Sequence, residues 1–353
     1  MIFNVLRKLF MIAGVVFSQA IFAQSPTVIR IAAPDLSAGA KHAAGGVTDV
    51  LYTKRWIENE FAKDHIKVQW YFFKGAGPAI NEALANNQID FAFLGDLPPI
   101  IGKARGLDTQ LLVPTTRGLT NYLAVRSDLN VKKLSDIKGK RIGILRGTAD
   151  ELSLIAALQS QGLSIRDVRL VNLDFNAVNA ALAAKRIDAS WGPARFIALR
   201  DKGIVKLPVS TRQLNGAGAS QGVFLGSQKF IKAYPKETQR LVNQVVNGLY
   251  WLSQEKNRIP QIALFFTQAS YPASVYAQEL HGVNFKFLYS PLFDQYYLTQ
   301  LQQKINLAQS QGLIRQPIQL KSWVNPQFAN QAIVNLKLQQ YWQPTATYDY
   351  LKK

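Results

Sequence analysis

Short apolar runs alternate with amphipathic stretches along the first third of the chain. Four of these runs predict strands: Val28 to Ala33, Ile66 to Phe73, Ile89 to Leu94 and Thr109 to Val113. Between the first two, residues 50 to 61 place their apolar side chains on one helical face. A β-α-β-α-β-α-β order implies parallel pairing with right-handed crossovers. This part of the chain therefore predicts one α/β lobe.

The same alternation restarts at Thr120. Further strands are predicted at Asn121 to Arg126, Arg141 to Leu145, Val168 to Leu173, Ile187 to Trp191 and Val205 to Val209. A glycine-rich segment follows, and the run Val223 to Leu225 is interpreted as the return of the chain to the first lobe. We therefore predict a second lobe at residues 120–215, and a first lobe formed by residues 24–119 and 216–353.

The last third of the chain is predicted to be helical. Helices are expected at Lys236 to Arg258, Pro260 to Phe266, Pro272 to Glu279 and Pro291 to Gln311, and the last three open with proline. The tail from Gln343 is rich in Thr and Tyr and is expected to lie on the surface. Neither these helices nor the tail carry a motif that indicates a function.

The first 23 residues resemble a cleavable export signal. Arg7 and Lys8 precede an apolar run, Leu9 to Phe17, that is too short to span a bilayer. Small residues then predict cleavage after Ala23, with Ala20 as the alternative. The chain has no cysteine, which excludes a lipid-anchored thiol and any disulfide. We expect a soluble periplasmic protein and a monomer.

Composition and charge narrow the class of partner. With 48% hydrophobic and 18% charged residues, the chain is typical of a globular protein. Two of the 41 basic residues lie in the signal. The mature chain therefore has 39 basic and 22 acidic residues, a net charge of about +17. The basic residues are scattered, without the aromatic-interleaved tract of a nucleic-acid groove. A positive field of this kind favours a small anionic ligand and does not name it.

The turn after the third predicted strand is the most specific local feature. Gly95 and Asp96 end the strand, and Pro98 and Pro99 open a helix. Such a turn is predicted to leave the backbone N–H groups of Asp96 and Leu97 free, where the positive end of the helix dipole attracts an anion. An ordinary connection without a ligand fits the same residues.

Two blocks around this turn carry a family resemblance. Phe73 to Ile100 combines a Gly-Pro before a helix with Ile89-Asp90-Phe91 and Gly95-Asp96-Leu97-Pro98-Pro99-Ile100, and is similar to sulfonate-binding proteins. Leu134 to Gly143 resembles the start of the second lobe in many such binders. Between about Ile29 and Leu252 the chain thus resembles the aliphatic sulfonate/taurine/nitrate-binding group of periplasmic proteins that serve ABC importers.

The resemblance implies a two-lobed type II periplasmic binding protein fold, with a hinge and a ligand cleft between the lobes. It also implies a membrane permease as partner, and no cofactor or metal. Sulfonate oxygens would accept hydrogen bonds from helix starts at Asp96 and Thr148, and the organic group would lie against Trp191. The full set expected near the ligand is Gly39, Lys41, His42, Gly75, Gly95, Asp96, Leu97, Pro98, Arg117, Thr148, Ala149, Trp191, Gly192, Arg195 and Gln221.

Structural alternatives exist for several of these residues. Thr148, followed by Glu151 three residues later, fits a capping box without any ligand. Trp191 fits a plain core position, and Lys41 fits a solvated surface. Arg117 fits either an anion contact or a charge on the hinge surface.

One departure from the family pattern bears on the ligand. Ile187 to Pro193 resembles the family's Trp-Asp-Pro turn, but Gly192 replaces the acid and Arg195 stands where aromatics are common. We expect this change to raise the local positive potential and to disfavour a ligand with an ammonium group, such as taurine. Alkyl or aryl sulfonates and sulfate esters fit better; nitrate and a thiamine-precursor heterocycle remain alternatives.

An enzyme is the first rival interpretation. The related fold occurs in thiamine-precursor biosynthesis, and α/β lobes support many reactions. The chain has only three histidines, His42, His65 and His281, and lacks a Gly-x-Ser-x-Gly or His-Glu-x-x-His motif. His42 is expected to donate a hydrogen bond to the ligand. We therefore predict a binding protein without catalytic activity.

Overall fold

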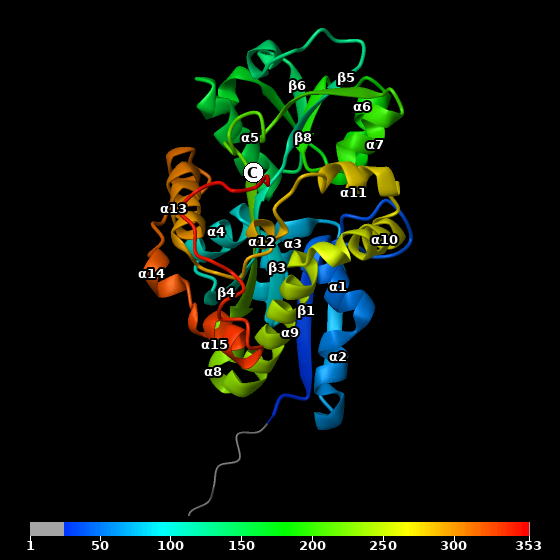
Figure 1. Ribbon diagram of the computed structural model, residues 1–353. Coiled ribbons are helices and arrows are strands. Elements are labelled where there is room, and N and C mark those ends of the chain that lie inside the picture. Colours follow the sequence, from blue (N-terminus) through cyan, green and yellow to red (C-terminus); the bar gives the residue numbers. More distant parts are fainter. Residues whose placement is uncertain (1–24, 353) are drawn as a thin grey trace, which may run out of the picture.

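The computed structural model describes residues 25–352, and the predicted export signal lies outside them. These residues form two α/β lobes, each built on a five-stranded sheet, stacked one above the other in Figure 1. The chain crosses between the sheets twice. It leaves the first after β4 (Thr109–Leu119) and returns on β10 (Ser220–Ser227).

The sheet of the first lobe has the order β2-β1-β3-β10-β4. Its other strands are β1 (Val28–Pro34), β2 (Lys67–Phe73) and β3 (Phe91–Gly95). Both neighbours of β1 are parallel to it, as predicted. Strand β10 instead runs antiparallel between β3 and β4, so the purely parallel sheet that we predicted is wrong. The reason is topological, because the return from the second lobe reverses the chain direction.

The sheet of the second lobe has the order β7-β6-β8-β5-β9. Its strands are β5 (Tyr122–Arg126), β6 (Arg141–Ile144), β7 (Arg169–Asn172), β8 (Ala189–Gly192) and β9 (Val205–Ser210). Strand β6 pairs in parallel with β7 and β8, whereas β5 pairs antiparallel with β8 and β9. Both sheets are thus mixed.

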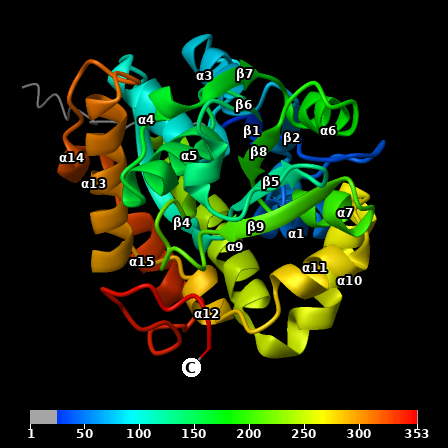
Figure 2. The same cartoon turned by 90° about the horizontal axis from the view of Figure 1, so that it is seen from above.

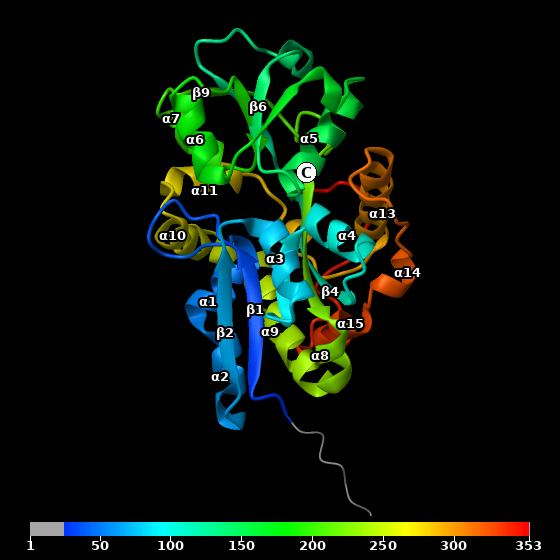
Figure 3. The same cartoon turned by 180° about the vertical axis from the view of Figure 1, so that it is seen from behind.

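Helices cover both faces of each sheet (Figures 1 and 3). In the first lobe they are α1 (Gly46–Lys54), α2 (Trp56–Phe61), α3 (Ala76–Ala85), α4 (Leu97–Ala104), α8 (Gln228–Ala233) and α9 (Pro235–Ser253). In the second lobe they are α5 (Ala149–Ser160), α6 (Phe175–Ala183) and α7 (Arg195–Asp201). Short 3₁₀ turns lie at Ala62–Asp64, Leu134–Ile137, Ile165–Asp167 and Glu255–Asn257.

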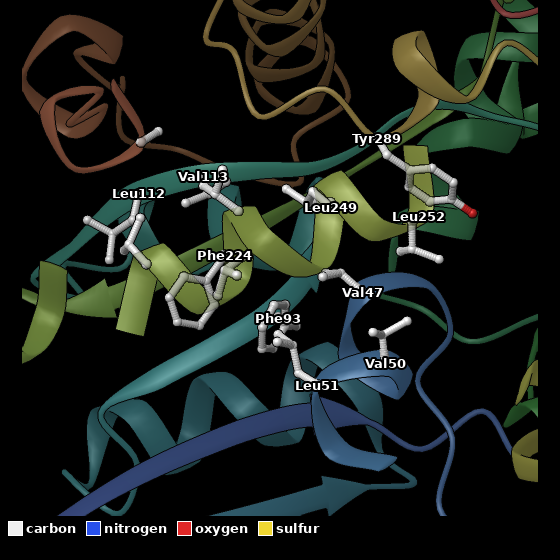
Figure 4. Close-up of a cluster of buried hydrophobic side chains, with 14 of the residues drawn as sticks. Val47, Val50, Leu51, Phe93, Leu112, Val113, Phe224, Leu249, Leu252 and Tyr289 are labelled. Atoms are coloured by element: carbon white, nitrogen blue, oxygen red, sulfur yellow. The ribbon is translucent and has the colours of Figure 1, made fainter. Parts of the chain in front are cut away.

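Helix α9 forms the centre of the core on one face of the first sheet. Its apolar stripe, which includes Leu249 and Leu252, packs between β4 and α1 (Figure 4). Phe93 and Phe224, on neighbouring strands, are in contact with ring centroids 4.6 Å apart. The strand β3 is buried on both faces, which explains its nearly uninterrupted apolar sequence.

The remaining helices follow α9. They are α10 (Arg258–Ala269), α11 (Ala273–Glu279), α12 (Phe285–Leu288), α13 (Gln295–Ser310), α14 (Leu320–Trp323) and α15 (Gln327–Asn335). Helix α11 reaches the second lobe, where Val275 packs with Ile197 and Ala198 of α7. Figure 2, seen from above, shows α11 beside α7. No helix within residues 25–352 has the length and apolar character needed to cross a bilayer.

Most residues of the C-terminal tail from Gln343 are exposed or half-exposed, as predicted, but Tyr350 is buried. Trp342 is buried, and Tyr350 is 1% exposed. Val283 and Leu351 form an isolated β-bridge, and Tyr350 accepts a backbone hydrogen bond from Asn284 at 2.8 Å. Aromatic rings of the tail fill space between the lobes, which is a tertiary event that the local composition does not indicate.

Candidate binding site

A cavity of about 320 Å³ lies between the two lobes. The first lobe lines it with the loop before α1, the start of α3 and the ends of β3 and β4. The second lobe contributes the starts of α5, α6 and α7, and the helices α10 and α11 close one side. The lining is mainly apolar and includes a small number of polar groups, which is the usual composition of a small-molecule site.

Helix N-termini converge on this cavity. Gly46 and Val47 of α1, Ala76 and Gly77 of α3, and Ala149 of α5 all line it. Each of these helices presents unpaired N–H groups and about half a positive charge at its first turn. The cavity is therefore electrostatically suited to an anion even without an unpaired cationic side chain.

Gln221, at the start of β10, has a buried side chain with no partner for its hydrogen bonds. The residue is 3% exposed and lines the cavity, and neither its amide oxygen nor its amide nitrogen has a hydrogen-bond partner. Its backbone N–H, in contrast, donates to Asp96 at 3.0 Å. A buried unpaired amide is costly, so a ligand that bonds to it would remove that cost.

Asn121 is a second polar residue of the lining, at the crossing between β4 and β5. Its amide nitrogen donates to Ser153 at 2.9 Å and to Ser220 at 2.7 Å, while its amide oxygen has no partner. These bonds join the two crossing segments to α5. Asn121 thus combines a fixed position with one acceptor that remains available.

Three acidic residues of the lining limit the positive charge of the cavity. Asp49, in the first turn of α1, accepts a hydrogen bond from the backbone of Ala44 at 2.8 Å, and burial raises its pKa to about 7. Burial also raises the pKa of Asp150, against the opposing effect of Arg195. Burial likewise raises the pKa of Glu279, which is opposed by Arg212. Unlike the other two, Asp49 has no cationic partner among the described residues. Because its pKa is about 7, its carboxyl group is partly protonated near neutral pH.

Arg195 is neutralised by the acid beside it. Its Nη2 lies 3.0 Å from Oδ2 of Asp150, and both side chains are largely buried. The Cβ that Gly192 lacks would lie 2.6 Å from that Nη2 and 2.8 Å from the carboxylate. The ion pair thus occupies the space beside Gly192. Our expectation of a higher local positive potential is wrong, because Asp150 supplies a carboxylate at this place.

The sequence-predicted residues divide into two groups. Those that line the cavity are Gly95, Pro98, Thr148, Ala149, Arg195 and Gln221. Those that do not are Gly39, Lys41, His42, Gly75, Asp96, Leu97, Arg117, Trp191 and Gly192. The second group includes most of the residues chosen for charge or aromatic character.

The Gly-Asp turn forms as predicted, but the backbone N–H of Leu97 has a protein partner. Oδ1 of Asp96 accepts from its neighbour Leu97 at 2.9 Å, and Oδ2 pairs with Lys304. The prediction of a free Leu97 N–H is therefore wrong. Asp96 acts as a buried connector between β3, β10 and α13, and Gly95 is the part of this turn that reaches the cavity.

Thr148 precedes α5 without the predicted capping box. Its hydroxyl donates to the carbonyl of Leu145 at 2.6 Å and makes no cap bond to the helix. Glu151 accepts instead from the backbone of Gly147 at 2.7 Å and from Arg146 at 2.9 Å. The first turn of α5 therefore faces the cavity without a side-chain cap from Thr148.

Arg117 and Trp191 are both buried away from the cavity. Arg117 donates to Asp294 at 2.7 Å and to the carbonyl of Leu292 at 2.5 Å. Trp191 is fully buried and donates to Ser153 at 2.7 Å. Both side chains hold elements together, which their residue types alone did not indicate.

In the loop after β1, the three residues predicted to bind the ligand lie outside the cavity. Lys41 is exposed, and His42 pairs with Asp35 at 3.0 Å and stacks on Phe72. Gly39 packs against Ser270. In this part of the chain, Pro34, Leu36, Ala43 and Ala44 line the cavity instead.

Sequence reasoning missed much of the lining. Thr115 and Thr116 lie in β4 just beyond the predicted strand Thr109 to Val113, so their position near the end of that predicted strand could have indicated them. The rings of Phe265, Tyr276 and Tyr350 could not, because they come from segments without a motif. Within residues 25–352, no group of three or more His, Asp or Glu side chains is arranged to hold a metal ion.

Comparison with known proteins adds the family. The family model described as NMT1/THI5 like matches residues 61–258. The chain belongs to the NMT1/THI5-like family. Its relatives include a protein of Bacillus subtilis (strain 168) named for aliphatic sulfonate binding, 29% identical over 204 residues, which cover 56% of this chain and 59% of that protein. The chain spans about half the length of the curated relatives it matches.

Solved structures of similar proteins cover more of this NMT1/THI5-like chain. The periplasmic sulfonate-binding protein SsuA from Methylobacillus flagellatus KT is 31% identical, with a TM-score of 0.77 over 92% of this chain and 99% of that one. The two-lobed architecture is therefore that of a periplasmic binding protein. The desulfurization enzyme DSZB has the same fold at 16% identity, with a TM-score of 0.67 over 88% of this chain and 99% of that enzyme. The fold by itself thus does not separate binding from catalysis.

Proposed function

We propose that the protein is the periplasmic solute-binding component of an ABC importer and captures an organosulfur anion, a sulfonate or a sulfate ester, for sulfur uptake. The observation that carries this proposal is the convergence of the α1, α3 and α5 N-termini on a cavity between two lobes. Oriented backbone N–H groups suit the oxygens of such an anion. The similarity to sulfonate-binding proteins supports the ligand class.

Binding would combine the polar and apolar parts of the lining. The anionic group would accept hydrogen bonds from the first turn of α5 and from the amide nitrogen of Gln221. The organic group would lie against the rings contributed by both lobes. Asp49, with its pKa raised to about 7, would repel the anion least when it is protonated.

In this proposal, closure of the two lobes captures the ligand. Gly95 in the first lobe and Ala149 in the second approach so closely that a Cβ at Gly95 would lie 2.6 Å from that of Ala149. Hinge closure around a ligand would then enclose it between the strand ends. The closed form would be recognised by the membrane permease, which is the partner that this proposal requires.

A thermal-shift and calorimetric panel tests the ligand class. It would contain alkylsulfonates, arylsulfonates, taurine, alkyl sulfate esters, nitrate, inorganic sulfate and a pyrimidine thiamine precursor. A ligand at about a hundred times its Kd stabilises the fold by roughly 2.7 kcal/mol, which shifts Tm by several degrees. We expect sulfonates or sulfate esters to do so. A shift only with nitrate or the heterocycle would instead assign the protein to another ligand class.

The same panel addresses catalysis. Each ligand that binds would be incubated with the protein at equal concentration, and the solution analysed by mass spectrometry. We expect the ligand to be recovered unchanged. Release of sulfite or sulfate in proportion to the protein would show that this fold carries an enzyme here.

A further inference from the structure

Aromatic side chains line much of the cavity, and the last third of the chain supplies most of them. Phe265 of α10, Tyr271 and Tyr276 around α11, Tyr289 after α12 and Tyr350 of the tail line the cavity. Figures 1 and 2 show α11 beside α7 of the second lobe, and Figure 1 shows α10 next to α1 of the first lobe. We call these five residues the aromatic wall.

Two hydroxyl groups of this wall are engaged within the protein. The hydroxyl of Tyr289 donates to Gln261 at 3.3 Å, and that of Tyr350 donates to Glu279 at 3.1 Å. Glu279 also pairs with Arg212 at 3.1 Å and accepts a hydrogen bond from Tyr122. Because these two hydroxyls are bonded to protein groups, a ligand can contact Tyr289 and Tyr350 through their rings.

The second lobe presents an aromatic surface as well. Phe175, at the start of α6, lines the cavity and stacks with Arg195, whose guanidinium carbon lies 4.7 Å from the ring centroid. In the wall itself, the rings of Phe265 and Tyr276 are tilted at 50° with centroids 5.6 Å apart. The organic part of a ligand would therefore meet rings from both lobes.

We infer that the ligand carries an aromatic ring, so that the substrate class is aryl sulfonates or aryl sulfate esters, with the aromatic wall as the specificity-determining surface. This inference rests on the proposed function. A methyl or ethyl group would leave most of the wall against water, whereas a ring gains apolar contact and offset or edge-to-face packing. The volume of about 320 Å³ also accommodates a ring together with its anionic group.

The test compares ring and chain at constant anionic group. Kd values for benzenesulfonate, 2-naphthalenesulfonate, ethanesulfonate and hexanesulfonate would be measured by isothermal titration calorimetry. We expect the aryl compounds to bind about tenfold or more tightly than the alkyl ones. Equal or tighter binding of the alkylsulfonates overturns the inference while leaving the proposed function intact. Binding of neither set, nor of the alkyl sulfate esters in the thermal-shift panel, overturns the proposed function itself.

Variants of the aromatic wall test the aryl preference independently. Tyr276→Leu should weaken arylsulfonate binding about tenfold and leave ethanesulfonate within about twofold, whereas Tyr276→Phe should retain the aryl preference. Phe266→Leu is the matched control, because Phe266 is on the same wall-forming helix as Phe265, is 49% exposed and does not line the cavity.

A folding defect can be separated from a loss of specificity. Circular dichroism would report the fold of each variant, and Phe175→Leu changes the aromatic surface from the other lobe. Equal weakening of aryl and alkyl ligands in both Tyr276→Leu and Phe175→Leu would overturn the inference, because a specificity surface must change the ratio of the two affinities.

Discussion

Asp150 and Arg195 form an ion pair of 3.0 Å in the wall of the cavity, in the space that Gly192 leaves by lacking a side chain. The sequence lacks an acid at position 192, and Asp150 of α5 supplies a carboxylate beside that position. A sequence comparison position by position sees a lost carboxylate, whereas the structure retains a carboxylate near the same place. The argument against taurine from Gly192 therefore has no structural basis.

The pair leads to a first prediction. Asp150→Asn leaves the Arg195 charge buried without its partner, so we expect a loss of about 3 kcal/mol in the free energy of unfolding. At the same time, the unpaired guanidinium should strengthen the binding of an anionic ligand. Urea denaturation and calorimetry check the two effects. Unchanged stability together with unchanged affinity would show that Arg195 is not held by Asp150 in solution.

Gln221 gives a prediction in which affinity and stability separate. Gln221→Leu removes an amide that has no partner in the protein, so stability should stay constant or increase slightly. Ligand affinity should fall about tenfold to a hundredfold, since a hydrogen bond to the ligand is lost. The backbone bond from Gln221 to Asp96 is unaffected by this change. A variant that binds as tightly as the wild type contradicts a role of Gln221 at the ligand.

We expect the titration of Asp49 to make the free energy of unfolding depend on pH. Its pKa is about 7, against an ordinary 3.8, because burial disfavours the charged form. The native protein therefore binds this proton more tightly than the unfolded chain does. Stability should fall as pH rises from about 4 to 7 and then level off, by about 4 kcal/mol.

The matched control for this effect is Asp49→Asn. It keeps an oxygen that can accept from Ala44 and removes the titration. The wild type minus the variant, measured by urea denaturation from pH 4.5 to 8, isolates Asp49 from other titrating groups. A difference that does not change over this range would mean that Asp49 is charged throughout.

We expect lobe closure to depend on the absence of a Cβ methyl group at Gly95. Gly95→Ala would place a Cβ 2.6 Å from that of Ala149, so the lobes should close less completely and ligand affinity should fall. Adding Ala149→Gly should restore part of the affinity, since it removes the opposing methyl group. Ligand-induced compaction measured by small-angle X-ray scattering would report closure. Failure of the double variant to recover any affinity would argue against this contact.

A variant of Arg117 tests whether this residue contacts the ligand, as expected from the sequence, or serves stability. Arg117→Ala breaks a buried pair with Asp294 and leaves that carboxylate unpaired. We expect a loss of about 3–5 kcal/mol in stability and, in the folded fraction, an unchanged ligand Kd. Affinity that falls while stability is retained would return Arg117 to the ligand site.

The sequence by itself determined the elements and the class of fold. Buried strands such as Ile89 to Leu94 and the α9 stripe follow from local periodicity, and the return of the chain near Val223 was visible as an apolar run after a glycine-rich segment. Because helix starts follow strand ends in this topology, loops such as Gly95 and Ala149 could be placed at the cavity.

The tertiary structure alone decided what the polar and aromatic side chains do. Asp96, Arg117 and Trp191 have the residue types of a binding site. Each side chain, however, bonds to a residue distant in the sequence, so no local pattern predicts that its hydrogen-bonding groups are already used within the protein. Tyr350 reaches the cavity only because the tail packs between the lobes. Local sequence fixes backbone conformation, whereas long-range packing determines which side chains are left unpaired and able to meet a ligand.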